Sequence, residues 1–193
     1  EYRGQTVWRD GRPLMLASET DSEDALPLGL IGFHQLANAA VALGLCAALG
    51  AQRIAIPRDA RRAGLSAPLW PGRLEVIPGQ PMTVVDSAHT PEAVALTVRS
   101  VRELLGRSRG PVILGALRDK RIPDMVAELR SYATRLILLR PQHPRGWTPE
   151  LLQHRFAAVG DLTRAAIAPD SATALRVARA ACGPREAVLA LGS

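Results

Sequence analysis

The chain contains the sequence TVVDSAHTP at residues 83–91, in which an apolar run ends on an acid and a short polar loop leads to a proline. The β-branched residues of the run predict a strand over Thr83–Asp86. Pro91 is typical of the first turn of a helix, where its missing N–H is not needed. The stretch therefore predicts a strand, a loop that carries His89, and a helix in direct succession.

The same alternation extends on both sides of this stretch. Short apolar strands are separated by segments of helical periodicity, which predicts an α/β fold with a Rossmann-like, parallel-rich sheet flanked by helices. Ligands of such sheets bind at the carboxyl ends of the strands. The expected strands are Leu74–Ile77, Thr83–Asp86, Val112–Leu114, Leu136–Leu139 and Ala187–Leu191, and the expected helices are Glu92–Leu105, Ile122–Tyr132, Pro149–Phe156 and Ala172–Ala181.

The amino-terminal part of the chain has a different pattern. A hairpin is expected around the turn Asp10-Gly11, between the strands Thr6–Trp8 and Leu14–Leu16, because an Asp-Gly pair between apolar runs favours a tight turn. A strand over Leu28–Gly32 and helices over His34–Leu49 and Pro57–Leu65 follow. The two prolines and the Trp of residues 66–72 indicate a boundary, so we expect two domains, at 1–66 and 71–193.

Composition excludes several classes of protein. The chain has 193 residues, a net charge of +6, 47% hydrophobic and 22% charged residues, as in globular proteins. Its 24 basic residues comprise one lysine, Lys120, and 24 − 1 = 23 arginines. Because Lys120 precedes an arginine, the chain has no Gly-Lys-Ser/Thr phosphate loop. The arginines are scattered and aromatic residues are few, so we expect no nucleic-acid partner.

The remaining whole-chain features favour a cytoplasmic protein without a membrane partner. Cys46 and Cys182 lie in apolar runs without metal-ligand spacing, which indicates free thiols and no metal site. The apolar run Leu36–Ala51 is expected to be too short and too polar to span a bilayer. The chain begins at Glu1 without a methionine and stops at Ser193 after an apolar run, so we expect a piece of a longer chain.

Four clusters contain residues suited to chemistry. His34 and Asn38 share one helix face, where an amide can pair with a base edge, or both can simply cap the helix entry. Arg73 follows a Pro-Gly turn and offers a fork of donors to phosphate, although a solvated arginine has the same pattern. Asp86 and His89 lie at a strand end beside a helix N-terminus, which suits a ribose hydroxyl or an anion and also suits a capping loop.

The fourth cluster holds the only lysine. The apolar strand Val112–Leu114 is followed by Gly115 and by the charged loop that contains Lys120. In a chain that otherwise uses arginine, a lysine suggests a place where a compact ammonium group is needed. An exposed lysine at a helix start is the alternative.

Taken in order, these clusters resemble the carboxyl-terminal half of the Mur ligase superfamily, and most closely its folylpolyglutamate synthase/dihydrofolate synthase branch. The helix GFHQLANAA at 32–40 is similar to that branch's GxHQxxNAA, and residues 71–75 match its PGRLE. The loop DSAHTP at 86–91 resembles DGAHNP, and Asp119-Lys120 resembles a DK after a strand. The terminal Leu191-Gly192-Ser193 is similar to the family's last strand.

The resemblance implies an ATP-dependent ligase that joins L-glutamate to a folate or dihydropteroate through an acyl phosphate. Domain 71–193 would then be the Mur ligase carboxyl-terminal domain, and 1–66 the end of the central ATP-binding domain. The family's P-loop, carbamylated lysine and Mg²⁺ ligands would lie upstream, so the chain alone would be inactive. The implied partners are small-molecule substrates, and a monomer is expected. The residues implied for ATP are His34, Asn38, Arg73 and Asp86; those implied for catalysis are His89 and Lys120; those implied for the amino acid are His89 and Ser193.

Two departures keep other functions open. Ser87 and Thr90 replace the Gly and Asn of DGAHNP, and AHTP is nearer to the cell-wall branch, which adds amino acids to a UDP-muropeptide. His34-Gln35 and the Arg73–Glu75 segment favour the folate branch. A non-catalytic module that binds a nucleotide or an amino acid is the alternative from a different class.

Overall fold

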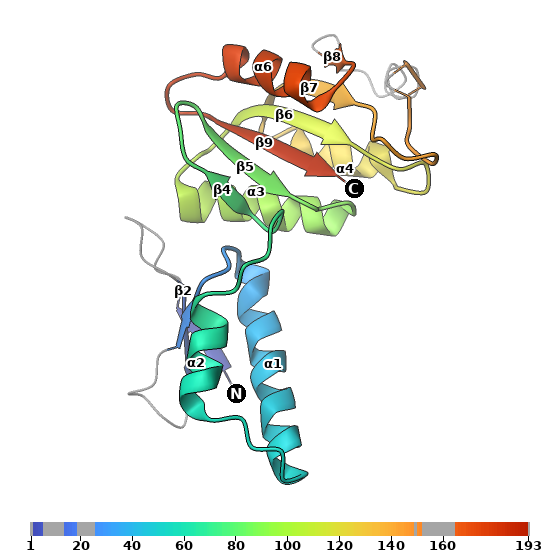
Figure 1. The fold of residues 1–193 in the computed structure, drawn as a ribbon. Helices are drawn as coiled ribbons and strands as arrows, with labels where there is room; N and C mark the ends of the chain where they lie inside the picture. Colours follow the sequence, from blue (N-terminus) through green and yellow to red (C-terminus); the bar gives the residue numbers. More distant parts are fainter. Residues whose placement is uncertain (1, 6–13, 19–25, 149, 152–164, 193) are drawn as a thin grey trace. The chain divides into compact units, whose positions relative to one another are not determined.

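The computed structural model describes residues 2–5, 14–18, 26–148, 150–151 and 165–192 of the chain (Figure 1). The chain divides into two compact units, Glu1–Arg73 and Leu74–Ser193. Each unit is described by itself below.

The first unit contains a small antiparallel sheet and two helices. Its strands β1 (Tyr2–Gln5), β2 (Leu14–Ser18) and β3 (Leu26–Leu28) pair in chain order. The helices are α1 (Phe33–Ala51) and α2 (Arg58–Ser66). The expected strand Thr6–Trp8 and its turn lie outside the described residues. The strand expected at Leu28–Gly32 lies earlier, because the chain bends at Gly29, where a Cβ would come within 2.4 Å of the Ser66 carbonyl oxygen.

Helix α1 is longer than the helix His34–Leu49 that the sequence predicted, and few of its side chains are buried. Its buried side chains are Gln35, Ala39 and Leu43, which recur at i, i+4 and i+8 and form one stripe. Val41 and Leu45 on other faces are 64% and 61% exposed. With 19 residues, α1 is long and apolar enough to cross a membrane by length and composition alone, contrary to the expectation. Core helices of ordinary domains pass the same test, so this is weak support for a span.

The second unit is built on a six-stranded sheet in the order β4-β5-β9-β6-β7-β8. Neighbours are parallel except for β4, which pairs antiparallel with β5 at one edge. The predicted parallel-rich α/β fold is confirmed. The strands are β4 (Glu75–Ile77), β5 (Met82–Asp86), β6 (Gly110–Gly115), β7 (Ala133–Leu139), β8 (Ala165–Ala168) and β9 (Ala187–Gly192).

Helices cover both faces of this sheet: α3 (Pro91–Leu105) and α4 (Ile122–Leu129) lie on one face and α6 (Ser171–Ala181) on the other (Figure 1). Every residue of β6 is buried. Since side chains alternate along a strand, Ile113 faces α6 while its neighbours face α3 and α4. The α6 side is packed by small residues, Ala174 and Ala178, against Ile137 and Val188. These small side chains let the helix approach the sheet closely.

The predicted elements of the second unit are largely confirmed, with local differences. Strand β8 was not expected, and the helix α4 ends at Leu129 and not at Tyr132. Thr90 caps α3 by accepting a hydrogen bond from the Ala93 N–H at 3.2 Å, and Pro91 is the first helical residue, as the sequence predicted. The helix expected at Pro149–Phe156 lies mostly outside the described residues.

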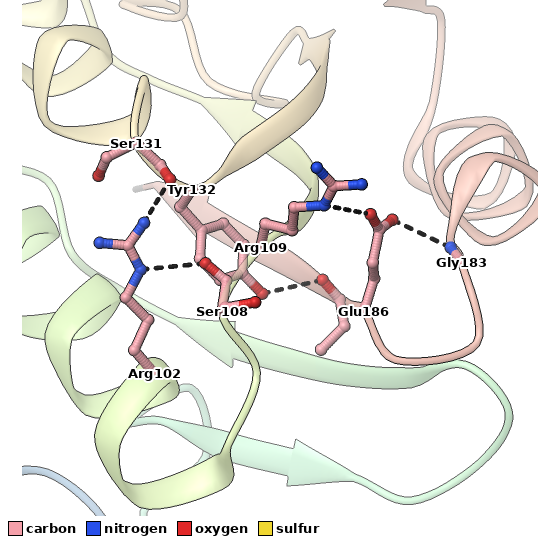
Figure 2. A network of polar contacts seen from close by, with 8 residues as sticks. Arg102, Ser108, Arg109, Ser131, Tyr132, Gly183 and Glu186 are labelled. Carbon is pink, nitrogen blue, oxygen red and sulfur yellow. Dashed lines mark hydrogen bonds and ion pairs between the residues drawn. The ribbon is translucent and has the colours of Figure 1, made fainter.

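A buried tyrosine joins the amino ends of three strands (Figure 2). The Tyr132 hydroxyl donates to the Ala187 carbonyl at 3.0 Å, and the Tyr132 carbonyl accepts from the Gly110 N–H at 3.0 Å. Around it, Arg109 donates to Glu186, and Arg102 donates to the carbonyls of Ser108 and Ser131. Burial raises the pKa of the Tyr132 phenol, with Cys182 and Glu186 as further causes. The edge of the sheet at which β6, β7 and β9 begin is therefore held by Tyr132 and by arginine side chains.

We expect Tyr132→Phe to lower the free energy of unfolding by about 1–3 kcal/mol, because a buried carbonyl loses its donor. A chemical denaturation series measures this loss. Because the folded state raises the phenol pKa, the hydroxyl's contribution is fully present below the unfolded pKa of about 10 and declines as pH rises above it. The difference between the two proteins should therefore shrink in alkaline solution, and a difference that grew above pH 10 would contradict this.

Candidate active site

Three strands end together at the carboxyl edge of the sheet in the second unit, and two of them lead into loops. Strand β9 lies between β5 and β6, with Leu191 opposite both Asp86 and Leu114 and with Gly192 opposite Gly115. The three strands therefore end at one level. Asp86 ends β5 and leads to His89, and Gly115 ends β6 and leads to Lys120. Ser193, which follows β9, lies outside the described residues.

The close approach of β6 and β9 at this edge depends on the glycine that ends β9. Gly192 has a φ of 133°, in the range that favours glycine, and a Cβ there would lie 1.6 Å from the Gly115 carbonyl oxygen. A Cβ on Gly115 would lie 3.4 Å from the Leu139 carbonyl oxygen, an ordinary contact. Gly192 is thus the residue that the strand spacing requires at this edge.

Asp86 is buried, with 6% of its surface exposed, and three protein donors surround its carboxylate. Oδ2 accepts from the Leu74 N–H at 2.7 Å, and Oδ1 accepts from the Ala88 N–H at 2.8 Å. Oδ1 also accepts from the Thr97 hydroxyl of α3 at 3.1 Å. These three hydrogen bonds engage the carboxylate within the domain. The expected contact with a ribose stays a prediction.

His89 lies partly buried in the loop between β5 and α3. Its Nδ1 is 2.8 Å from the Ser87 carbonyl oxygen. Because a carbonyl accepts only, Nδ1 carries the proton of this hydrogen bond. In the neutral ring, Nε2 is then an acceptor, and in the charged ring it is a second donor. The loop therefore fixes the imidazole ring through Nδ1, and Nε2 is the nitrogen that could contact a ligand.

Lys120 lies in the loop after β6, with 23% of its side chain exposed. Its Nζ is 3.2 Å from Asp119 Oδ2, and this pairing contributes to lowering the pKa of Asp119, after that residue's own backbone N–H. Backbone hydrogen bonds hold the loop against residues 145–147: Arg118 donates to Arg145 at 2.9 Å and Trp147 to Ala116 at 3.1 Å. The lysine thus projects from an ordered loop.

An ion pair joins the loops that carry His89 and Lys120. Arg121 lies beside Lys120, and its Nη2 is 2.5 Å from Oε1 of Glu92 in the first turn of α3. The backbone N–H of Glu92 is the first cause, and Arg121 the second, of a lowered pKa for this carboxyl. Both side chains are exposed, so we expect the pair to add little stability. It does show that the two loops lie within side-chain reach of each other.

The first unit holds the remaining candidates, at the start of α1. Gln35 is buried, and its Nε2 lies 3.0 Å from Nε2 of His34. Its Oε1 accepts from Asn38 Nδ2 at 2.9 Å. The structure therefore brings His34 and Asn38 together through Gln35, which served in the sequence as a mark of the folate branch and not as a site residue. Arg73, the last residue of the first unit, is exposed.

Two further features were missed. Thr97, eleven residues after Asp86, completes the environment of that carboxylate, and no local pattern points to it. A cavity of about 390 Å³ lies beyond the carboxyl ends of β7 and β8, lined by Arg140, Pro141, Gln142, His143, Pro144 and Pro169. The polar loop after the strand Leu136–Leu139 is the pattern that points to it. Within the described parts of the chain, no three His, Cys, Asp or Glu side chains gather in a way that could hold a metal ion.

The parallel sheet, with the loops of His89 and Lys120 at its carboxyl edge, defines an α/β domain of the Rossmann-like class, whose members bind ligands at this edge. A known family described as "Mur ligase, glutamate ligase domain" matches residues 72–193. The chain belongs to this family, which confirms the resemblance found in the sequence.

Similar proteins include enzymes of both branches. The chain is 32% identical over 124 residues, 64% of its length and 29% of the relative's, to "Dihydrofolate synthase/folylpolyglutamate synthase" of Bacillus subtilis. It is 30% identical over 203 residues, 98% of its length and 38% of the relative's, to "UDP-N-acetylmuramoyl-L-alanyl-D-glutamate--2,6-diaminopimelate ligase" of Alkalilimnicola ehrlichii.

Among solved structures, folylpolyglutamate synthase of Mycobacterium tuberculosis, complexed with ADP and AMPPCP, is similar with a TM-score of 0.80 and 26% identity. The similarity covers 99% of this chain and 44% of that chain. The chain thus spans less than half the length of these relatives.

Proposed function

We propose that this chain is part of an ATP-dependent ligase that adds L-glutamate to a folate or dihydropteroate. The reaction would begin with transfer of the γ-phosphoryl group to a carboxylate oxygen of the folate, which releases ADP. The glutamate amine would then attack the acyl carbon, phosphate would leave, and the amine would lose a proton. The observation that carries the proposal is the meeting of three strand ends, with the loops of His89 and Lys120, at one edge, in a chain whose relatives include folate ligases.

The residues would divide between two substrates. His34 and Asn38, joined by Gln35, would contact adenine, and Arg73 would contact the phosphates through its guanidinium. His89 and Lys120, whose loops share one edge, would hold the incoming glutamate as partners of its carboxylates. Ser193, which follows β9 in the sequence, is the third residue proposed for this substrate. A ribose contact of Asp86 remains part of the proposal.

The phosphate loop and the Mg²⁺ ligands would lie in the part of the enzyme that corresponds to the regions of the relatives outside the matched segment. The chain has no Gly-Lys-Ser/Thr loop, so we infer that it does not hold a triphosphate for in-line transfer by itself. The described residues do not supply a cluster for Mg²⁺, so we place no magnesium ligand among them. The exposed apolar residues Val41 and Leu45 of α1 fit a helix that packs against further parts of a central domain. A monomeric state and a cytoplasmic location remain predictions.

A specific observation favours a second candidate. The loop DSAHTP differs from the folate pattern at Ser87 and Thr90, and a muropeptide ligase matches nearly the whole chain. The same edge would then bind another amino acid, and the acceptor would be a UDP-muropeptide. The two candidates share the acyl-phosphate chemistry and differ in the acceptor.

A substrate screen separates them. The full-length enzyme that contains this chain is incubated with ATP, Mg²⁺ and glutamate, and ADP formation is followed with dihydropteroate, with a folate, or with a UDP-muropeptide and its amino acid. We expect ADP only with the folate-type acceptors. ADP with the muropeptide alone would establish the second candidate, and ADP with neither would favour a non-catalytic binding module. The 193-residue chain alone should form no ADP.

Replacing His89 by alanine in the full-length enzyme should act on the amino-acid step. We expect kcat/KM for glutamate to fall about 10- to 100-fold, as for loss of a hydrogen bond to a charged group, with the KM for ATP nearly unchanged. Steady-state kinetics with each substrate varied in turn measures this. His143→Ala, an exposed histidine in another loop, is the matched control. A defect confined to ATP would contradict the assignment.

A further inference from the structure

One carboxylate in the second unit holds two chain segments that carry different candidate residues. Asp86 Oδ2 accepts from the N–H of Leu74, the residue directly after Arg73. Asp86 Oδ1 accepts from the N–H of Ala88, the residue directly before His89. The two distances, 2.7 and 2.8 Å, are those of strong charge-assisted hydrogen bonds. A single buried side chain is therefore linked to the neighbours of both residues.

Leu74 has an unusual backbone for its residue type. Its φ is 47°, in the left-handed region that a residue with a Cβ rarely adopts. Its side chain is 1% exposed, so burial holds it from one side. The Asp86 carboxylate holds its N–H from the other. Because both the side chain and the N–H are held, the backbone conformation of Leu74 is fixed at this point.

Helix α3 in turn restrains the carboxylate. Thr97, itself 1% exposed, donates its hydroxyl to Oδ1 at 3.1 Å. Oδ1 then accepts two hydrogen bonds and Oδ2 one, which leaves one acceptor position on Oδ2. The two hydrogen bonds between Asp86 and the Leu74 and Ala88 amides, called the Asp86 bridge below, are thus anchored in the core by Thr97. A ribose hydroxyl would have only the remaining acceptor position on Oδ2.

We propose that Asp86 is a positioning residue that fixes the backbone of Leu74, the residue directly after Arg73, relative to the loop of His89. The kinetic consequences rest on the proposed function, because they assume that Arg73 serves ATP and His89 serves glutamate. The bridge itself concerns only the second unit. It acts through two backbone N–H groups and needs no contact between Asp86 and a substrate.

Amide hydrogen exchange of the 193-residue chain tests the bridge directly. In the unmodified chain, the Leu74 and Ala88 amides should exchange at least 10-fold more slowly than an unstructured peptide. Asp86→Asn keeps the shape but replaces one acceptor oxygen by an NH₂ donor, so at least one of these amides should lose its protection. Thr97→Val, the matched control, removes a bond of the same carboxylate and should leave both amides protected.

Exchange measurements test the bridge even if Asp86→Asn fails to fold, because the unmodified chain alone reports on the hydrogen bond at Leu74. Exchange of the Leu74 amide at the rate of an unstructured peptide would overturn the proposal. So would full protection of both amides in a folded Asp86→Asn variant. Neither outcome depends on whether the enzyme uses folate.

Kinetics of the full-length enzyme then separates positioning from a ribose contact. For positioning, Asp86→Asn should lower kcat about 10- to 100-fold, and the loss should be equal with ATP, 2′-deoxy-ATP and 3′-deoxy-ATP. For a ribose contact alone, the loss should be in the KM for ATP and should vanish with one of the deoxynucleotides. That second pattern would overturn the positioning role. An enzyme inactive with every acceptor would instead refute the proposed function, with the exchange result still standing.

Discussion

Replacing Gly192 by alanine should lower the free energy of unfolding of the second unit by at least about 3 kcal/mol, the range of backbone strain combined with a core clash. The φ of 133° is the first cause, since side-chain-bearing residues rarely adopt it. The second cause is steric: the new Cβ would lie 1.6 Å from the Gly115 oxygen and 2.7 Å from its carbonyl carbon. Both are backbone atoms of β6, so relief requires the two strands to move apart.

A second glycine separates the two causes. Gly106, which ends α3, has a φ of 62°, and a Cβ there would meet nothing within 4 Å. Gly106→Ala should therefore cost only the conformational part, about 1 kcal/mol. Urea denaturation of the chain, followed by circular dichroism, measures both variants. Equal stabilities of the two would show that the strands part easily and would contradict the steric account.

The position of Gly192 also links stability to the proposed site. Gly192 precedes Ser193, and its partner Gly115 precedes the loop of Lys120. Strands forced apart here would displace the loop and the chain end together. A Gly192→Ala protein that does fold should therefore lose more activity than its stability alone would suggest.

The sequence predicted most of the second unit because its patterns are local. Runs such as Thr83–Asp86 and Val112–Leu114 are apolar and bounded by turn residues, and Pro91 with Thr90 marks a helix start in a few letters. Strand β8 was missed because Ala165–Ala168 is mostly alanine, a residue with low β-propensity. Tyr132 was assigned to α4, whereas its side chain is used in a hydrogen bond to Ala187.

The candidate residues could be chosen from the sequence, but their relations could not. No local sequence pattern predicts that β9 lies between β5 and β6. This strand order nevertheless brings the loop of His89 and the loop of Lys120 to one edge. The bonds of Asp86 to Leu74 and Thr97 span 12 and 11 residues, and they depend on how the sheet and α3 pack. Asp86, chosen from the sequence as a ligand contact, thus accepts hydrogen bonds from backbone N–H groups in the structure. Its sequence neighbourhood does not predict these bonds.

Replacing Arg73 by alanine in the full-length enzyme should weaken the use of ATP far more than the binding of glutamate. Arg73 is exposed and follows the turn at Gly72, whose φ of 70° is in the left-handed region. The planar guanidinium offers donors that suit phosphate oxygens. Arginines beside a phosphoryl group in transfer stabilise its negative charge. We expect kcat/KM for ATP to fall about 100- to 1000-fold, at or below the lower end of the range for arginines that stabilise a phosphoryl group in transfer.

Two further variants show whether the guanidinium itself is responsible. Arg73→Lys keeps the charge but loses the fork, so it should recover only part of the lost activity. Arg62→Ala removes another exposed arginine, from α2, and should leave the kinetics unchanged. Initial rates with ATP varied at saturating glutamate, and the reverse, give the two constants separately. An increase of the KM for glutamate with normal ATP dependence would move Arg73 to the amino-acid side of the site. Full activity of Arg73→Ala would remove it from the site altogether, because no other arginine of the chain stands in the PGRLE segment.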